Sequence, residues 1–259
     1  MVSSGQFVGM GMAIVLPVLV VAVLYIIVNR HSRKIETGMM GAVGYGALGY
    51  LWQQLLYLMA VVMLTNQAWL RNAIGSHFVI SAVVYGFVCS IFVALGMYWG
   101  IYLTNQKQRS IYRSITIGIG FGLGNIAWNI LAPYSMSLYD AIRINAGTFN
   151  GNEKTRESIL TTASATMYLD ALKCVLLLVI YMGVAYMMAD LYLKGKKWQA
   201  GAVPVAAQLV ISLSNAFMRQ YLPELAARIG IYAVLALFAA ASARTVFTFL
   251  LKYPESVQD

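Results

Sequence analysis

Apolar residues fill long, nearly continuous runs along the 259-residue chain, and polar residues are confined mainly to the short segments between them. A helix needs about 20 mostly apolar residues to cross the roughly 30 Å hydrocarbon core of a bilayer. Backbone polar groups at that depth must be bonded internally, so only helices and closed barrels span membranes. The runs are too long and continuous for the roughly ten-residue alternating strands of a barrel. The pattern therefore predicts an all-α, polytopic membrane protein.

The runs predict seven transmembrane helices in a single domain over residues 1–259. A long polar segment, residues 133–157, follows the fourth span and contains asparagines and glycines typical of turns. The short break at residues 219–224 predicts an antiparallel hairpin between the last two spans. The predicted spans are residues 7–28, 39–64, 78–103, 115–131, 171–190, 202–217 and 225–250.

Basic residues gather in alternate loops, which predicts the orientation. Lys and Arg resist translocation, so the loops that follow spans one, three and five are expected in the cytoplasm. The N-terminus is then outside and the C-terminus cytoplasmic, as in a multi-pass protein of a bacterial plasma (cytoplasmic) membrane. The three loops carry Arg30, Arg33 and Lys34; Lys107, Arg109 and Arg113; and Lys194, Lys196 and Lys197.

Composition agrees with this class. Hydrophobic residues make up 60% of the chain and charged residues 10%, against about 25% charged in ordinary soluble domains. The net charge of +9 lies mostly in loops beside spans, so we expect the lipid bilayer as a partner and no nucleic acid. Cys89 and Cys174 lie within apolar runs and are expected to be small buried side chains.

Ionisable side chains, the usual functional residues inside a bilayer, are scarce in the predicted spans. The first four spans contain no Asp, Glu, Lys or Arg. Asp170 and Lys173 lie one helical turn apart at the outer edge of the fifth span and are expected to pair there. His31 and His77 lie at loops, and the chain has no HExxH motif. We therefore expect no metal and no other cofactor.

Glycine pairs spaced four residues apart occur on the third and fourth spans, and the second span opens with a glycine-rich stretch. Such small-xxx-small pairs let helix backbones approach closely, which predicts close contact among spans two, three and four. A nucleotide-binding loop is disfavoured because no strand precedes the glycines. The pairs are Gly96 with Gly100, Gly118 with Gly122, and Gly120 with Gly124.

The same two spans resemble the YhfC family of proposed intramembrane proteases, relatives of the CAAX-prenyl-protease and PrsW groups. Residues 94–103, ALGMYWGIYL, are similar to the span that carries the EExxR motif of that family. Residues 118–125, GIGFGLGN, are similar to the next span, which reads roughly GxGFGxxE. The order and topology of the spans resemble the family over nearly the whole chain.

The positions that are catalytic in the family carry other side chains. None of these can act as a general base near neutral pH or bind a catalytic divalent ion well. The resemblance therefore implies a protease-like fold that has lost its catalytic centre. The paired glutamates fall on Met97 and Tyr98, the arginine on Ile101, the next glutamate on Asn125, and two later histidines near Tyr181 or Met182 and in residues 210–212.

A centre without charges becomes a neutral polar pocket, for which the candidate residues are Gln53, Gln54, Tyr98, Asn125 and Asn129. Such a pocket can bind a helix through interhelical hydrogen bonds of about 0.6 kcal/mol each. We expect a non-enzymatic membrane scaffold, or a subunit that binds a transmembrane or amphipathic peptide or another membrane subunit. Two alternatives remain open: a permease-like subunit of a transporter complex, and an active intramembrane protease with a differently placed centre.

Overall fold

The computed structural model describes the chain except residues 33–38, 69–71, 73–76, 105–109 and 253–259. In the described part every regular element is a helix, and seven helices are long and apolar enough to cross a membrane. The predicted all-α fold with seven spans is therefore confirmed. The helices are α1 (Ser4–His31), α2 (Met39–Asn66), α4 (Phe78–Thr104), α5 (Ile111–Ile126), the π-helix η1 (Ala127–Leu131), α6 (Ala132–Asn145), α7 (Glu153–Thr161), α8 (Ser164–Leu193), α9 (Lys197–Tyr221) and α10 (Glu224–Lys252).

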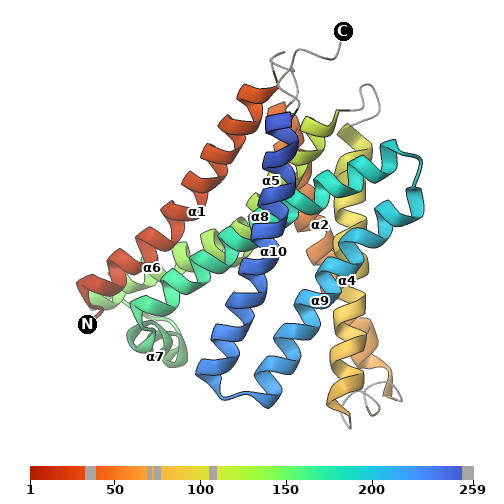
Figure 1. Ribbon diagram of the computed structural model, residues 1–259. Helices are drawn as coiled ribbons and strands as arrows, with labels where there is room; N and C mark the ends of the chain where they lie inside the picture. Colours follow the sequence, from red (N-terminus) through yellow and green to blue (C-terminus); the bar gives the residue numbers. More distant parts are fainter. Residues whose placement is uncertain (33–38, 69–71, 73–76, 105–109, 253–259) are drawn as a thin grey trace.

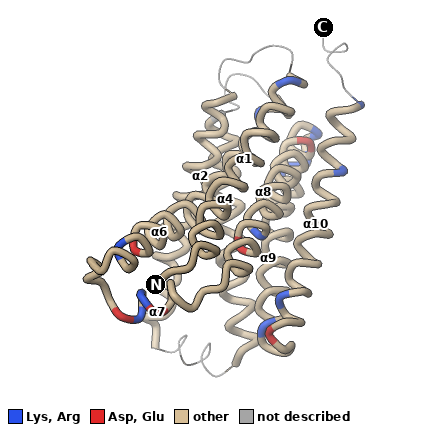
Figure 2. The backbone as a smooth tube through the Cα atoms, turned by 90° about the vertical axis from the view of Figure 1, so that its left-hand side faces the viewer, with Lys and Arg blue, Asp and Glu red and all other residues tan. Residues whose placement is uncertain are grey.

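Successive spanning helices run in opposite directions and give the bundle two ends (Figure 1). The basic end contains the end of α1, the start of α5 and the α8–α9 junction, with Arg30, Lys196 and Lys197. The mixed-charge end contains the start of α1, helix α7 and the turn between α9 and α10. Most charged residues gather toward these two ends (Figure 2). Arg33, Lys34, Lys107 and Arg109 of the predicted basic clusters lie outside the described residues.

Helices α5 and α8 form the centre of the bundle. Twelve of the 16 residues of α5 are buried. Helix α2 packs on α5 and α4, α9 packs on α4 and α8, and both α1 and α10 lie against α8. Large apolar side chains on the outer faces remain exposed, as expected for helices that contact lipid.

The fourth span is longer than predicted. The helix does not end at Leu131 but continues through η1 and α6 to Asn145, so the first half of the expected polar loop is helical. Pro133 has no N–H to donate and its ring crowds the carbonyl four residues earlier. The helix accommodates it with one wider turn, in which the Ala132 N–H donates to the Ala127 carbonyl. A proline that suggested a helix end therefore marks a π turn.

Two polar side chains join the segments of the mixed-charge end. Asn145, the last residue of α6, accepts a 2.7 Å hydrogen bond from the Val2 N–H and donates to the Val2 carbonyl at 3.1 Å. The buried Gln6 amide nitrogen, on α1, lies 3.0–3.1 Å from three carbonyl oxygens at the C-terminal end of α7, those of Ile159, Leu160 and Thr162. These contacts join α1 to α6 and α7 beside a small apolar cluster that the same helices share.

Candidate functional site

Two glycines on one face of α5 set its distance from α2. A β-carbon on Gly124 would lie 2.7 Å from the Ala47 carbonyl oxygen, and one on Gly120 would overlap the Val43 carbonyl. Both distances are shorter than real β-carbon contacts, so any larger residue would force the two backbones apart. Bare backbone therefore meets backbone along the α2–α5 contact.

The other two glycines of α5 face α8. A β-carbon on Gly118 would lie 2.6 Å from the Tyr181 carbonyl oxygen, and one on Gly122 would overlap the Leu178 side chain. The two interleaved glycine pairs thus occupy two different faces of α5, and each face meets a different helix.

On α4, Gly96 and Gly100 lie at similar close contacts. A β-carbon on Gly96 would lie 2.6 Å from the Gly49 carbonyl oxygen and 2.9 Å from the Gln53 β-carbon, both on α2. One on Gly100 would lie 3.1 Å from the Ile117 side chain on α5. The second, third and fourth spans are therefore packed closely at their glycines.

The buried face of α2 reaches only to the middle of that helix. Residues that recur every three or four positions form this face, and none beyond Gln53 belongs to it. Its last two residues, Tyr50 and Gln53, are polar and continue the three- to four-residue spacing of the small residues before them. The buried residues are Met39, Ala42, Val43, Gly46, Gly49, Tyr50 and Gln53.

Tyr50, Asn125 and Asn129 form a hydrogen-bonded group, here called the mid-span cluster. The Tyr50 hydroxyl donates to the Asn125 side-chain oxygen at 2.9 Å. The Asn129 side-chain nitrogen lies 2.7 Å from the same oxygen, and 3.1 Å from both the Tyr50 hydroxyl and the Asn125 backbone carbonyl. The cluster links α2, α5 and η1.

The cluster lies halfway along both helices. Tyr50 is 11 residues after Met39 and 16 before Asn66, while Asn129 is 18 residues after Ile111 and 16 before Asn145. Asn125 is 2% exposed, whereas Asn129 is exposed on the surface of the bundle. The polar groups of the mid-span cluster thus extend from the buried interior to the exposed surface, far from both ends of the helices.

Several polar atoms in this region have no hydrogen-bond partner among the described residues. They include the buried Gln53 side-chain oxygen and the buried Asn125 side-chain nitrogen. Gln53 donates to the Gln54 side-chain oxygen at 3.1 Å. The Asn129 side-chain oxygen likewise accepts no bond from a described residue. A buried polar group without a partner costs about 1–3 kcal/mol, so the region retains unused hydrogen-bonding capacity.

Aromatic rings close the inner side of the cluster. The Phe121 ring lies 5.1 Å from the Tyr50 ring and 5.0 Å from the Tyr181 ring, both nearly edge-on. Met97 is fully buried in the same apolar cluster, and Ile101 packs against it. Met97, Ile101 and Tyr181, three of the positions compared with the YhfC family in the sequence, thus lie in or against one apolar cluster.

Tyr98 does not line the mid-span cluster, contrary to expectation. Its side chain is 46% exposed on α4 and stacks on Tyr102, with ring centroids 6.2 Å apart. Consecutive residues of a helix point about 100° apart, so a buried Met97 turns Tyr98 toward the surface. Tyr50 takes part instead, although it was not predicted. Its position three residues before Gln53 and four after Gly46 is the signal that could have identified it.

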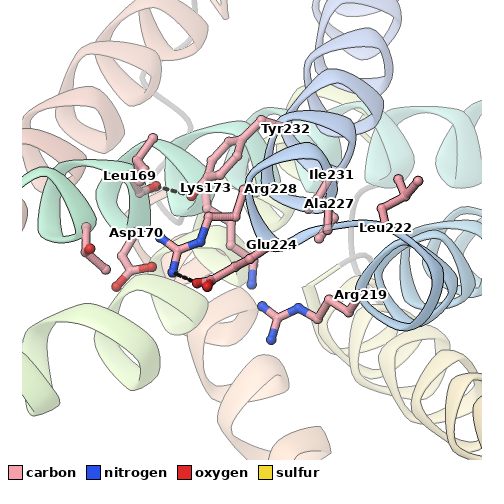
Figure 3. A pocket seen from close by; sticks show the side chains of 11 residues that line it. Leu169, Asp170, Lys173, Arg219, Leu222, Glu224, Ala227, Arg228, Ile231 and Tyr232 are labelled. Carbon is pink, nitrogen blue, oxygen red and sulfur yellow. Dashed lines mark hydrogen bonds and ion pairs between the residues drawn. The ribbon is translucent and has the colours of Figure 1, made fainter.

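Asp170 and Lys173 do not form the predicted ion pair. Asp170 accepts a 2.8 Å hydrogen bond from the Tyr134 hydroxyl on α6. Lys173 forms no ion pair or hydrogen bond with another described residue. Both side chains line a cavity at the mixed-charge end (Figure 3).

The mid-span cluster can donate and accept hydrogen bonds but offers no group that titrates as a base near neutral pH. Within the described residues, no three His, Cys, Asp or Glu side chains are grouped so that they could hold a metal ion. The groups that the cluster offers are thus neutral hydrogen-bond donors and acceptors. Comparisons with protein-family models, curated proteins and solved structures found no match to this chain.

Proposed function

We propose that this protein is a non-catalytic membrane scaffold subunit that binds a transmembrane or amphipathic helix at the mid-span cluster. Asn129 carries the proposal, because its exposed amide lies halfway along a spanning helix and its oxygen accepts no hydrogen bond from a described residue. An amide oxygen left without a hydrogen bond in hydrocarbon is unfavourable. A second helix that donates a hydrogen bond to this oxygen would remove that cost.

The surroundings of Asn129 support a lateral contact with a helix. Past Gln53 the second half of α2 has no buried residue, and α6 buries only Ala141. Trp128, beside Asn129 on η1, is 37% exposed. The polar groups thus lie where the α2–α5 contact ends and free helix surface begins. Single π turns are frequent at functional sites.

The residues at the family's catalytic positions support a role without catalysis. Met97 and Tyr181 are buried in one apolar cluster, and Asn125 contributes only an amide. Activation of water at membrane depth needs a base or a metal-bound water. These side chains supply neither, so the resemblance to the YhfC family suggests a retained fold used for binding.

Site-specific photocrosslinking in native membranes tests the proposal. With a photoreactive amino acid at Trp128, we expect a crosslink to a membrane peptide or to a single-span protein. Asn129→Leu should weaken it strongly, since leucine offers no acceptor. The same photoreactive residue at Leu237, which is 71% exposed on α10, serves as the control. Crosslinks to lipid alone, or equal yields with and without Asn129, would contradict helix binding.

One observation favours the permease-like alternative: a charged cavity opens between α8 and the α9–α10 turn. Purification in mild detergent separates the two functions. A co-purifying ATPase whose retention is unaffected by Asn129→Leu would favour a transporter subunit. A protein that requires Asn129 would favour the scaffold. Cleavage of a transmembrane peptide by the purified chain would instead favour the active protease.

A further inference from the structure

A cavity of about 380 Å³ lies where the turn between α9 and α10 approaches the first turns of α8 (Figure 3). Its volume is within the roughly 300–1,000 Å³ range of small-molecule sites. The Tyr232 hydroxyl on α10 donates to the Leu169 carbonyl on α8 at 2.8 Å and fixes one wall. The charged side chains that line the cavity are Asp170, Lys173, Arg219, Glu224 and Arg228.

Both carboxylates of the cavity already have partners. Arg228 donates to Glu224 at 2.6 Å, one turn away on α10. Asp170 accepts from the Tyr134 hydroxyl at 2.8 Å. Three cationic side chains therefore face two carboxylates, and one of those cations is paired with Glu224.

The other two cations have no carboxylate partner among the described residues. Arg219 donates through Nε to the Asn215 side-chain oxygen at 3.1 Å, and no described residue accepts from its two terminal nitrogens. Lys173 is half-buried, nine residues after the start of α8. An ammonium group at that position in a spanning helix is costly unless water or an anion solvates it.

We infer that this cavity binds a phosphate-type oxyanion between Lys173 and Arg219. An oxyanion offers several acceptor oxygens, which suits the planar fork of an arginine and the point charge of a lysine at the same time. Apolar side chains, Leu222 and Ile231, line the cavity beside the cations. The phosphate can belong to a phospholipid headgroup whose chains lie along the bundle, or to a water-soluble phosphate. Either would connect α8 to the α9–α10 turn. This inference does not depend on helix binding at the mid-span cluster.

Thermal unfolding of the purified full-length chain in mild detergent tests the site, because a ligand that binds the folded state stabilises it. We compare inorganic phosphate with chloride at matched ionic strength, and phosphatidylglycerol with phosphatidylcholine in mixed micelles. Phosphate or phosphatidylglycerol should raise the unfolding temperature. Lys173→Gln and Arg219→Gln should each weaken the apparent affinity about tenfold or more, since each removes a charge-assisted hydrogen bond. Lys154→Gln removes the same charge from α7, outside the cavity, and should leave the apparent affinity unchanged.

The outcomes separate the sources of the phosphate. A response to phosphatidylglycerol alone identifies a lipid headgroup, while a response to inorganic phosphate as well identifies a soluble ligand. An equal response to chloride, or equal affinities of the wild type and the cavity variants, overturns the site. Should Lys173→Gln not fold, Arg219→Gln decides the question, because Arg219 is exposed and its one described hydrogen bond is to Asn215.

Discussion

At the scale of single residues, this bundle uses neutral amides and hydroxyls where soluble proteins often use charges. Asn125 accepts from both Tyr50 and Asn129 at mid-span, and Gln6 joins α1 to α7 at one end. Each bond is modest, because the unfolded chain in a membrane also finds partners. Loss of one partner is more costly than the bond itself, since the remaining group stays buried and unpaired.

Tyr50→Phe should lower the free energy of unfolding by about 0.6–1.5 kcal/mol. The substitution keeps the ring contact with Phe121 but removes the hydroxyl that donates to Asn125. Tyr45→Phe on the same helix is the matched control, since Tyr45 is 42% exposed. Thermal unfolding in detergent measures both. Equal stability of the two variants would show that the Tyr50 hydroxyl contributes nothing to the stability of the fold.

Gln6→Met should destabilise the chain by about 1–3 kcal/mol, because methionine fills a similar volume but cannot donate to the carbonyls that end α7. Ser3 would also lose the Gln6 oxygen that accepts from its N–H at 2.9 Å. Proteolysis of the segment around α7 is expected to accelerate. Gln67→Met, at an exposed glutamine, controls for the change of side chain and should leave both readouts unchanged.

At the scale of helices, glycines decide which elements meet. A β-carbon on Gly120 would overlap the Val43 carbonyl, whereas one on Gly44 would meet nothing within 4 Å. Gly120→Ala should therefore lower the free energy of unfolding by about 1–3 kcal/mol, because the added methyl group overpacks the contact. Gly44→Ala should stabilise by about 0.5–1 kcal/mol through helix propensity. Unfolding in detergent compares them. A loss of stability in both variants, of similar size, would contradict the close α2–α5 contact.

Sequence patterns predicted the helices better than their details. Apolar length identifies a span whatever surrounds it, and the spacing of Gly118, Gly120, Gly122 and Gly124 identified two contact faces. The path after Leu131 was not predictable in this way, because Pro133 can either end a helix or be absorbed in a π turn. Only the three-dimensional packing of the surrounding helices determines which occurs.

The mid-span cluster was likewise predictable only where its residues are close together in the sequence. Asn125 and Asn129 are four residues apart, so one helix face brings them together. Their partner Tyr50 is 75 residues away from Asn125 in sequence, and no local pattern pairs the two. The cavity could not be predicted from the sequence, because Lys173 and Arg219 come from different helices that meet only in the folded bundle.

At the scale of the whole molecule, most Lys, Arg, Asp and Glu residues lie toward the two ends (Figure 2), and large exposed apolar side chains lie on the helices between them. Lys194, Lys196 and Lys197 lie around the α8–α9 junction, with Asp190 nearby to pair with Lys194 at 2.7 Å. The opposite end balances its cations with acids, as in the Arg156–Glu153 pair at 3.2 Å. An exposed ion pair of this kind contributes little stability, so the asymmetry bears on orientation in the membrane more than on folding.

Orientation is the prediction that belongs to this scale. Because Lys and Arg resist translocation, the basic end should face the cytoplasm and the mixed-charge end the outside. Fluorescent-protein fusions after Lys196 and Lys252 should be bright, and a periplasmic phosphatase inserted at Asn150 should be active. The reciprocal fusions, phosphatase after Lys196 and fluorescent protein at Asn150, are the controls and should be silent. Phosphatase activity after Lys196 would reverse the orientation, and activity at both Lys196 and Asn150 would contradict the crossing of α8 through the bilayer.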